Sequence, residues 1–221
     1  MKKGKDGVYS KYVKRVLDVI CALLAMTVFC WLYGILALLV RIKLGSPVIF
    51  KQERPGLNEK IFTLYKFRTM TNGMDANGNL LSDEERLTKF GRLLRSTSLD
   101  ELPEVWNILK GDMSVIGPRP LLVSYLLYYT KEEHRRHDVR PGLSGMAQVS
   151  GRNALTWNER LKLDEIYVQT LSFWGDVKIV FLTAFKVLFR KDVQSGNEMQ
   201  MQDLNVERSQ YVRNHSHNSI Y

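Results

Sequence analysis

Two adjacent acidic residues, Asp100 and Glu101, stand in the middle of the chain within Ser98-Leu-Asp-Glu-Leu-Pro103. Proline is tolerated in the first turn of a helix, where backbone N–H groups lack partners. We therefore expect Asp100 to cap a helix over residues 103–109. A helix N-terminus favours an ionised carboxylate and attracts phosphate, so Asp100 is a candidate nucleophile at a phosphate site. The alternative is a capping role alone, with Ser98 and Glu101 as a capping box.

Cations of suitable geometry flank this pair. Lys66 and Arg68 stand two residues apart at the end of an expected strand, so they share a face and could grip a phosphate. A solvated strand edge is the alternative. Arg119 lies between Pro118 and Pro120, and such a rigid loop presents a guanidinium in one direction, as bidentate phosphate recognition requires.

Two further segments alternate glycine with cationic or polar residues. They are Arg140-Pro-Gly142 and Gln148-Val-Ser-Gly-Arg152, and they make Arg140, Gln148 and Arg152 candidate substrate-binding residues. Backbone N–H groups in such loops are available to anions. Each segment taken alone could be a turn with a solvated arginine. Four such segments around one acidic pair favour a phosphorylated substrate.

Composition narrows the class of function. The chain has 221 residues and a formal net charge of +9, which indicates an anionic partner. The basic residues lie largely beside an apolar segment, so nucleic acid is not the simplest partner. The chain has no Walker A sequence, no GxGxxG after a strand and no GxSxG elbow. His134 and His137 stand three apart on a charged helix end, where we expect a solvated face rather than a metal site. His215 and His217 receive no role.

The apolar segment covers residues 19–40 and carries no charge. A stretch of about 18 or more such residues is a candidate membrane helix. Both of its flanks are rich in Lys and Arg, and the positive-inside rule assigns such flanks to the cytoplasm. A re-entrant helix keeps both flanks inside, whereas a plain single span is the alternative. Asp18, at its start, is expected to pair with a cation such as Arg15 or to be solvated.

These residues are positioned by a fold that we expect to be mainly helical with a few short strands. A basic cytoplasmic N-terminus (1–15) and a membrane helix (16–41) precede a catalytic domain (42–192), and a disordered polar tail follows (193–221). Residues 173–190 form an amphipathic helix, either interfacial or packed. The other expected elements are strands 47–50 and 60–66, a loop 72–82 and helices 83–94, 121–136 and 155–171.

Taken in order, these segments resemble the bacterial sugar transferase family, the monotopic phosphoglycosyl transferases, in the short form that is a catalytic unit only. The resemblance runs from about Lys14 to Arg190. It rests on the apolar segment with Asp18 and on Lys66-Phe-Arg-Thr-Met70, Ser98-Leu-Asp-Glu-Leu-Pro103, Lys110-Gly-Asp-Met-Ser114, Ile116-Gly-Pro-Arg-Pro120, Arg140-Pro-Gly142 and Gln148-Val-Ser-Gly-Arg-Asn153.

The resemblance implies transfer of a phosphosugar from a UDP-sugar to undecaprenyl phosphate, with UMP as the second product. It implies that Asp100 is the nucleophile of a covalent intermediate and a ligand of Mg²⁺, that Glu101 assists, and that Arg95 and Arg119 bind phosphate. The expected reaction starts surface-glycan assembly at the bacterial cytoplasmic membrane, with the active site facing the cytoplasm. Expected partners are membrane lipids and downstream glycosyltransferases, and self-association is left open.

The chain departs from the family pattern in one place. Where family members commonly break the re-entrant helix with Ser-Pro, this chain has Cys30-Trp31, so a straight span stays open. Two other functions also stay open, a hydrolase that needs no lipid acceptor and a membrane-anchored scaffold without activity. No residue identifies the sugar.

Overall fold

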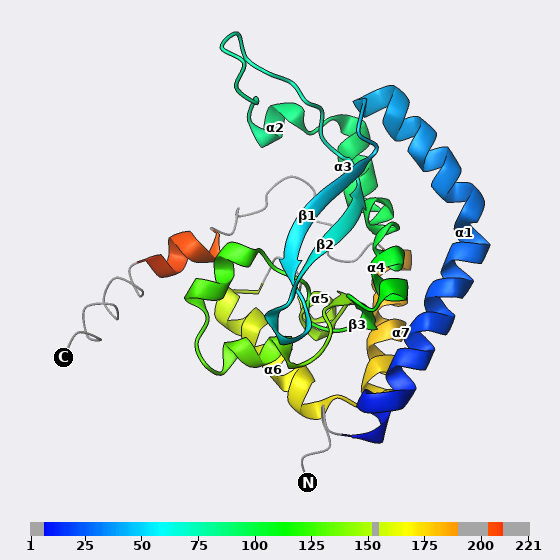
Figure 1. Ribbon diagram of the computed structural model, residues 1–221, viewed down its shortest axis with the longest axis vertical. Coiled ribbons are helices and arrows are strands. Elements are labelled where there is room, and N and C mark those ends of the chain that lie inside the picture. The colour runs from blue at the N-terminus through cyan, green and yellow to red at the C-terminus, as the bar shows by residue number, and fades with distance from the viewer. Residues whose placement is uncertain (1–6, 152–154, 190–202, 210–221) are drawn as a thin grey trace, which may run out of the picture. The chain divides into compact units, whose positions relative to one another are not determined.

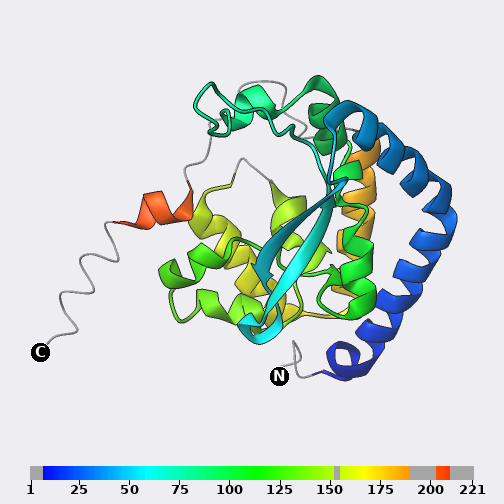
Figure 2. The same ribbon diagram turned by 45° about the horizontal axis from the view of Figure 1, so that its top comes forward.

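The computed structural model describes residues 7–151, 155–189 and 203–209, which belong to two compact units (Figures 1 and 2). One unit comprises Val16–Gln52 and Thr63–Val115, and we call it the acidic unit because it contains Asp100. The other comprises Met1–Arg15, Glu53–Phe62 and Ile116–Tyr221, and we call it the arginine-loop unit. Helices dominate the described residues and the strands are short, which confirms the predicted fold class.

The apolar segment forms one continuous helix, α1 (Lys14–Leu44), after a π-helical turn, η1 (Tyr9–Val13). Within the described residues, Tyr9–Leu44 is the one helical stretch whose length and apolar composition would allow it to cross a membrane. Both figures show α1 as curved (Figures 1 and 2). The helix is unbroken over Lys14–Leu44, a range that includes Cys30-Trp31 and Gly34. The re-entrant path stays a prediction.

The acidic unit has an apolar core on the C-terminal half of α1. Leu36, Val40 and Leu44 of that helix pack against Phe67 and Leu94. These leucines and valine recur every four residues, the spacing that places side chains on one face of a helix. Phe67 ends β2 (Ile61–Phe67) and Leu94 belongs to α3 (Lys89–Ser96), so this core sets the positions of the strand and helix that carry Lys66 and Arg95.

The other elements of the acidic unit follow α1 in chain order. The hairpin of β1 and β2 has its base in this unit, and the loop after β2 projects away from the rest of the unit (Figure 1). The predicted helix 83–94 is two helices, because Thr88 starts a new one by accepting a hydrogen bond from the Gly91 N–H. The elements are β1 (Ile49–Pro55), β2 (Ile61–Phe67), α2 (Asp83–Arg86), α3 (Lys89–Ser96), η3 (Leu99–Glu101), α4 (Glu104–Lys110) and β3 (Ser114–Ile116).

Asp18 is a buried residue near the start of α1, with 4% of its surface exposed. Its Oδ1 accepts hydrogen bonds from the Ser114 hydroxyl at 2.9 Å and the Val115 N–H at 3.0 Å. The expectation of a solvated Asp18 is therefore wrong. A carboxylate satisfied in this way can be buried at the start of an apolar helix without an exposed charge.

The arginine-loop unit contains the tip of the hairpin and the C-terminal half of the chain. The predicted helix 121–136 is wrong, since the chain forms two 3₁₀ helices there. They are separated at Thr130, whose N–H donates to Glu133 Oε2 at 2.8 Å. The elements are η2 (Leu57–Glu59), η4 (Val123–Tyr128), η5 (Glu133–Asp138), β4 (Gly142–Ser144), α5 (Met146–Ser150), α6 (Trp157–Thr170) and α7 (Phe173–Phe189).

Helix α7 presents large apolar side chains that the described residues leave exposed. Trp174 is 76% exposed and Phe181 is 72% exposed, whereas Asp176 and Ile179 are buried. An ordinary packed amphipathic helix would bury its aromatic side chains. The exposure of these side chains therefore favours the interfacial alternative for this helix.

The C-terminal tail contains an ordered segment. The sequence predicts disorder over residues 193–221, but residues 204–209 are helical. Leu204 is fully buried in a cluster with Tyr125 and Trp157. Arg208 donates to both carboxylate oxygens of Glu133, at 2.6 and 2.9 Å. The prediction of disorder missed this segment because its polar contacts depend on tertiary partners, and a single buried apolar anchor produces no periodic pattern.

Candidate functional site

Asp100 lies in the first turn of a helical stretch that begins at Leu99. The N-cap is Ser98, in the left-handed conformation with φ +56°, and its side chain makes no capping hydrogen bond. The predictions that Asp100 is the N-cap and that Ser98 and Glu101 form a capping box are therefore wrong. Asp100 is 8% exposed. Its position among first-turn N–H groups still favours an ionised carboxylate.

Glu101, the second member of the pair, has a cationic partner. Lys66 Nζ lies 2.8 Å from Glu101 Oε1 and 3.0 Å from Glu104 Oε1. Glu104 is 2% exposed, so the lysine offsets the charge of a buried carboxylate as well as that of Glu101. Lys66 was predicted to bind substrate. In the structure Lys66 contacts the acidic residues Glu101 and Glu104. Its contact with substrate stays a prediction.

Arg95 contacts the segment that follows β2, the segment to which Arg68 belongs. Arg95 Nε donates to the Thr69 hydroxyl at 3.0 Å. Helix α3 can approach the residues after β2 closely because Gly91 lies at the contact. A Cβ on Gly91 would lie 1.8 Å from the Thr69 carbonyl oxygen. Only glycine at this position lets α3 place Arg95 against the end of the strand.

The guanidinium of Arg68 is only partly satisfied. Its Nη1 is buried and has no hydrogen-bond partner among the described residues. Burial lowers the pKa of Arg68, and the neighbouring charge of Arg86 lowers it further. An unmet donor on a buried cation carries an energetic cost, which an anionic ligand would remove. This geometry suits the predicted phosphate contact.

In the arginine-loop unit, glycines hold the Arg119 and Arg140 segments side by side. The Gly142 N–H donates to the Pro118 carbonyl at 2.9 Å, and the Gly117 N–H donates to the Ser144 carbonyl at 2.8 Å. A Cβ on Gly142 would lie 2.0 Å from the Gly117 nitrogen. The close approach therefore requires glycine, and it places two predicted phosphate-binding segments next to each other.

A buried arginine that the sequence analysis missed supports this loop. Arg136 is 3% exposed and pairs with Asp164 Oδ2 through Nη2 at 2.7 Å and Nε at 3.1 Å. Its Nη2 also donates to the Arg119 carbonyl at 2.7 Å. The run Arg135-Arg136-His137 gives no sign of which cation is buried, because burial depends on the tertiary partner Asp164.

The side chain of Arg119 is exposed and stands near a second guanidinium. Burial lowers the pKa of Arg160, and the charge of Arg119 lowers it further. Two arginines close enough to repel one another are stabilised by an anion placed between them. Arg160 was not among the predicted residues, since its place in a helix of mixed charge carries no motif.

Gln148 lies on α5 with its side-chain amide buried. Neither Nε2 nor Oε1 has a hydrogen-bond partner among the described residues. A buried amide of this kind is a candidate for ligand contact. Arg152 lies outside the described residues, so its predicted role is not tested. The structure thus gathers Lys66, Arg68, Arg95, Asp100 and Glu101 in the acidic unit and Arg119, Arg140 and Gln148 in the arginine-loop unit.

The acidic pair fits the expected magnesium ion. Magnesium is usually bound through one or two carboxylates together with substrate phosphates and water. Asp100 and Glu101 are adjacent carboxylates in one helical turn, so the donor set suits the ion. That Asp100 is the residue that holds it is what the resemblance implies, and it stays a prediction.

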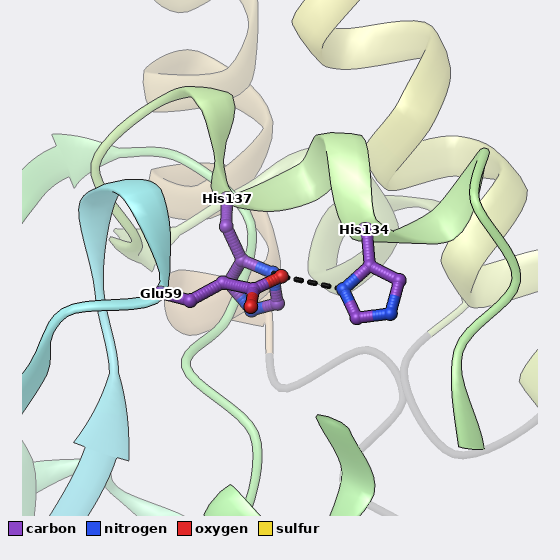
Figure 3. A group of neighbouring side chains, drawn as sticks. All are labelled: Glu59, His134 and His137. Carbon is purple, nitrogen blue, oxygen red and sulfur yellow. Dashed lines mark hydrogen bonds and ion pairs between the residues drawn. The ribbon is translucent and has the colours of Figure 1, made fainter. Parts of the chain in front are cut away.

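A third group of titratable residues was not expected. Glu59, at the hairpin tip, meets His134 and His137 of η5 (Figure 3). The expectation of a solvated histidine face is wrong for His137, which is 5% exposed. Burial and the charge of Arg136 lower the pKa of His137 to about 4. This imidazole is therefore neutral at pH 7.

The family model described as bacterial sugar transferase matches residues 9–190. The chain belongs to the bacterial sugar transferase family. The match covers every residue of the three groups described above and stops before the ordered tail segment 204–209. The family resemblance inferred from the motifs is thereby confirmed.

Three relatives illustrate the range of similarity. The uncharacterized sugar transferase EpsL of Bacillus subtilis is 51% identical over 85% of this chain and 93% of its own. The UDP-glucose:undecaprenyl-phosphate glucose-1-phosphate transferase of Caulobacter vibrioides is 39% identical over 79% of this chain and 69% of its own. The undecaprenyl-phosphate galactose phosphotransferase of Salmonella typhimurium is 36% identical over 83% of this chain. The alignment covers only 42% of that longer relative.

Proposed function

We propose that this protein transfers a sugar phosphate from a UDP-sugar to undecaprenyl phosphate, giving undecaprenyl diphosphate sugar and UMP. The named relatives that act on undecaprenyl phosphate support this class of reaction. The observation that carries the proposal is the buried Asp100 beside a Lys66-paired Glu101, since this pair matches the family motif. The product would begin assembly of a bacterial surface glycan.

The first step would be attack by an Asp100 carboxylate oxygen on the phosphorus attached to the sugar. The bond from that phosphorus to the UMP oxygen breaks, UMP leaves, and the sugar phosphate stays on Asp100. A carboxylate in a helical first turn is stabilised in its ionised, nucleophilic form. When bound, magnesium held by Asp100 would neutralise diphosphate charge.

Arginines would bind the phosphate groups of the donor. Arg68 has a buried, unmet donor, and Arg119 carries an exposed guanidinium on a loop fixed by Arg136. Preorganised cations that face developing negative charge supply much of the rate acceleration in phosphoryl transfer. Arg95, Arg140, Gln148 and Arg152 are assigned to substrate on their family motif positions.

The second step would transfer the sugar phosphate to the lipid. An oxygen of undecaprenyl phosphate attacks the same phosphorus, and the bond to Asp100 breaks and restores the carboxylate. Glu101, held by Lys66, would orient the acceptor phosphate or remove its proton. Because UMP leaves first, the acceptor can use the space that it vacates.

The lipid acceptor would be reached from the membrane surface. Helix α1 is long and apolar, and α7 exposes Trp174 and Phe181. An exposed aromatic face on a helix suits the headgroup region. We therefore propose a place in the bacterial cytoplasmic membrane, with the catalytic residues on the cytoplasmic side where UDP-sugars are available.

The test is UMP release by the detergent-solubilised full chain with magnesium and a panel of UDP-sugars. Release that needs both undecaprenyl phosphate and Asp100 would support the transferase and identify the sugar. Sustained release without lipid would indicate a hydrolase instead. Absence of release from folded protein, with a panel that covers glucose, galactose and N-acetylated amino sugars, would favour the scaffold alternative.

A further inference from the structure

None of Glu59, His134 and His137 belongs to a motif assigned above. One ligand atom from each residue can be chosen so that all lie within 4.8 Å of one another. The carboxylate of Glu59 points toward the ring of His134, with the ring of His137 beside it (Figure 3). The distance from Glu59 Oε1 to Nδ1 is 2.5 Å for His134 and 3.6 Å for His137.

Local structure explains why the three side chains converge. A 3₁₀ helix has three residues per turn, so His134 and His137 of η5 stack on one face. Glu59 ends the short helix η2 in the left-handed conformation, with φ +62°. This turn directs the carboxylate toward η5.

His137 provides the second, independent observation. Its side chain is 6% exposed, and neither Nδ1 nor Nε2 has a hydrogen-bond partner among the described residues. Glu59 contacts His134, and this contact provides no hydrogen bond to either ring nitrogen of His137. A buried polar group without a partner needs explanation, and a bound ion is one of the recognised explanations.

We propose that Glu59, His134 and His137 form a binding site for zinc that ties the hairpin tip to η5. Two imidazole nitrogens and one carboxylate oxygen are ligands that zinc accepts, with a fourth position left for water. Zinc–ligand bonds of about 2.0–2.1 Å place tetrahedral ligand atoms about 3.3 Å apart. The two Glu59–histidine distances, 2.5 and 3.6 Å, lie on either side of that value.

The surroundings suit a divalent cation. The Tyr129 ring packs against both histidines, with 5.6 and 5.7 Å between ring centroids, and so shields the two imidazoles from solvent on one side. The nearest buried cation, Arg136, is paired with Asp164. Magnesium prefers oxygen ligands, so the site discriminates against the ion proposed at Asp100.

Zinc binding to the full chain tests this site. The protein carries an affinity tag without histidine and the substitutions His215→Asn and His217→Asn, since the chain has four histidines in all. After removal of metal with a chelator, zinc is titrated by calorimetry in millimolar magnesium. Cobalt absorption reports coordination by nitrogen and oxygen. We expect one zinc per chain and a zinc-dependent rise in melting temperature.

Variants assign the binding to the three residues. Glu59→Gln and His134→Asn should each weaken zinc binding at least tenfold and abolish the rise in melting temperature. Both side chains are partly exposed, so these variants should fold even if His137→Asn does not. Glu132→Gln, an exposed carboxylate next to η5, is the matched control and should bind as the parent does.

Three results would overturn the site. One is absence of zinc binding by folded protein, and another is unchanged affinity in Glu59→Gln. The third is zinc binding that the chain with His215 and His217 shows and the doubly substituted chain lacks, which would mean an adventitious ion only. None of these readouts depends on transfer of sugar phosphate, so the test stands apart from the proposed function.

Discussion

Lys66 Nζ lies 2.8 Å from Glu101 Oε1 and thereby joins β2 to the acidic pair. The same nitrogen lies 3.0 Å from Glu104 Oε1, and the exposed fractions of these side chains are 18% for Lys66 and 3% for Glu104. One cation therefore compensates two carboxylates in a poorly hydrated place. The lysine holds the Glu101 carboxylate in position, which a general base requires.

Replacing this lysine should change the pH dependence of the reaction. In Lys66→Met, Glu101 and Glu104 lose their cation and repel one another, so the pKa of the pair rises. The acidic limb of the UMP-release profile should move to higher pH. Lys66→Met/Glu104→Gln should reverse part of that shift, because it removes the like charge. An unmoved acidic limb in Lys66→Met would mean that the ion pair has no part in catalysis.

Asp100→Asn should abolish turnover, because an amide oxygen cannot form the proposed acyl phosphate. Loss of a nucleophile lowers kcat by about a thousandfold or more. Asp83→Asn is the control, since Asp83 lies in the same unit with its side chain 77% exposed. Intact-mass analysis should detect one sugar phosphate on the parent protein when lipid is withheld. Full activity in Asp100→Asn would exclude the covalent route.

Asp100 and Glu101 could be singled out as candidate site residues from local sequence. The backbone conformation around them could not be predicted in this way. Pro103 correctly indicated that a helix starts nearby, because proline is tolerated in the first turn of a helix but not in its interior. The start itself moved to Leu99 because Ser98 adopts a left-handed conformation, which residue type does not predict. Glu101 could be singled out because it stands next to Asp100 in the sequence. Glu104 could not be singled out, because its contact with Lys66 depends on the tertiary structure.

Arg136 and His137 show a second limit of sequence reasoning. In a run of charged residues, the pattern predicts a solvated helix face, and both side chains are instead buried. The cause is tertiary, since Asp164 on α6 compensates Arg136. Long-range pairs of this kind cannot be read from one sequence. The long apolar helix, in contrast, depends on composition alone and was predicted correctly.

Arg136→Met should raise KM for the UDP-sugar more than it lowers kcat. The variant removes the donor to the Arg119 carbonyl and so loosens the loop that presents Arg119. It also leaves Asp164 buried without the cation that it pairs with, which should destabilise the fold by about 3–5 kcal/mol. Arg136→Met/Asp164→Leu should recover much of the stability without recovering KM. Recovery of both would mean that Arg136 acts only through stability.

Shortening the side chain of Leu204 should release the helical tail segment 204–209 from the cluster against which it packs. Leu204→Ala removes a fully buried side chain from the cluster with Tyr125 and Trp157, and such changes cost about 2–5 kcal/mol. We expect faster proteolytic cleavage within residues 203–209 and no loss of the rest of the fold. Val206→Ala, at a side chain 56% exposed, is the control. Equal cleavage rates in the two variants would contradict a docked tail.

The buried imidazole of His137 should make the metal-free protein less stable in acid. Burial and the charge of Arg136 lower its pKa to about 4. The charge of Glu59 and the His134 backbone oppose the shift, and the charge of the His134 ring adds to it. Above about pH 6.5 the ring is neutral in both the folded and unfolded states, so the free energy of unfolding does not depend on it.

Between about pH 6.5 and 4, the unfolded chain binds a proton that the folded chain refuses. The free energy of unfolding should therefore fall by about 1.4 kcal/mol per pH unit, or about 3 kcal/mol in all. Urea unfolding in detergent and chelator, from pH 8 to 4, should show this loss in the parent protein. His137→Gln should lack it, and the difference between the two proteins removes the contribution of the carboxylates. Parallel pH profiles in the two proteins would mean that His137 is protonated as easily in the folded state as in the unfolded state.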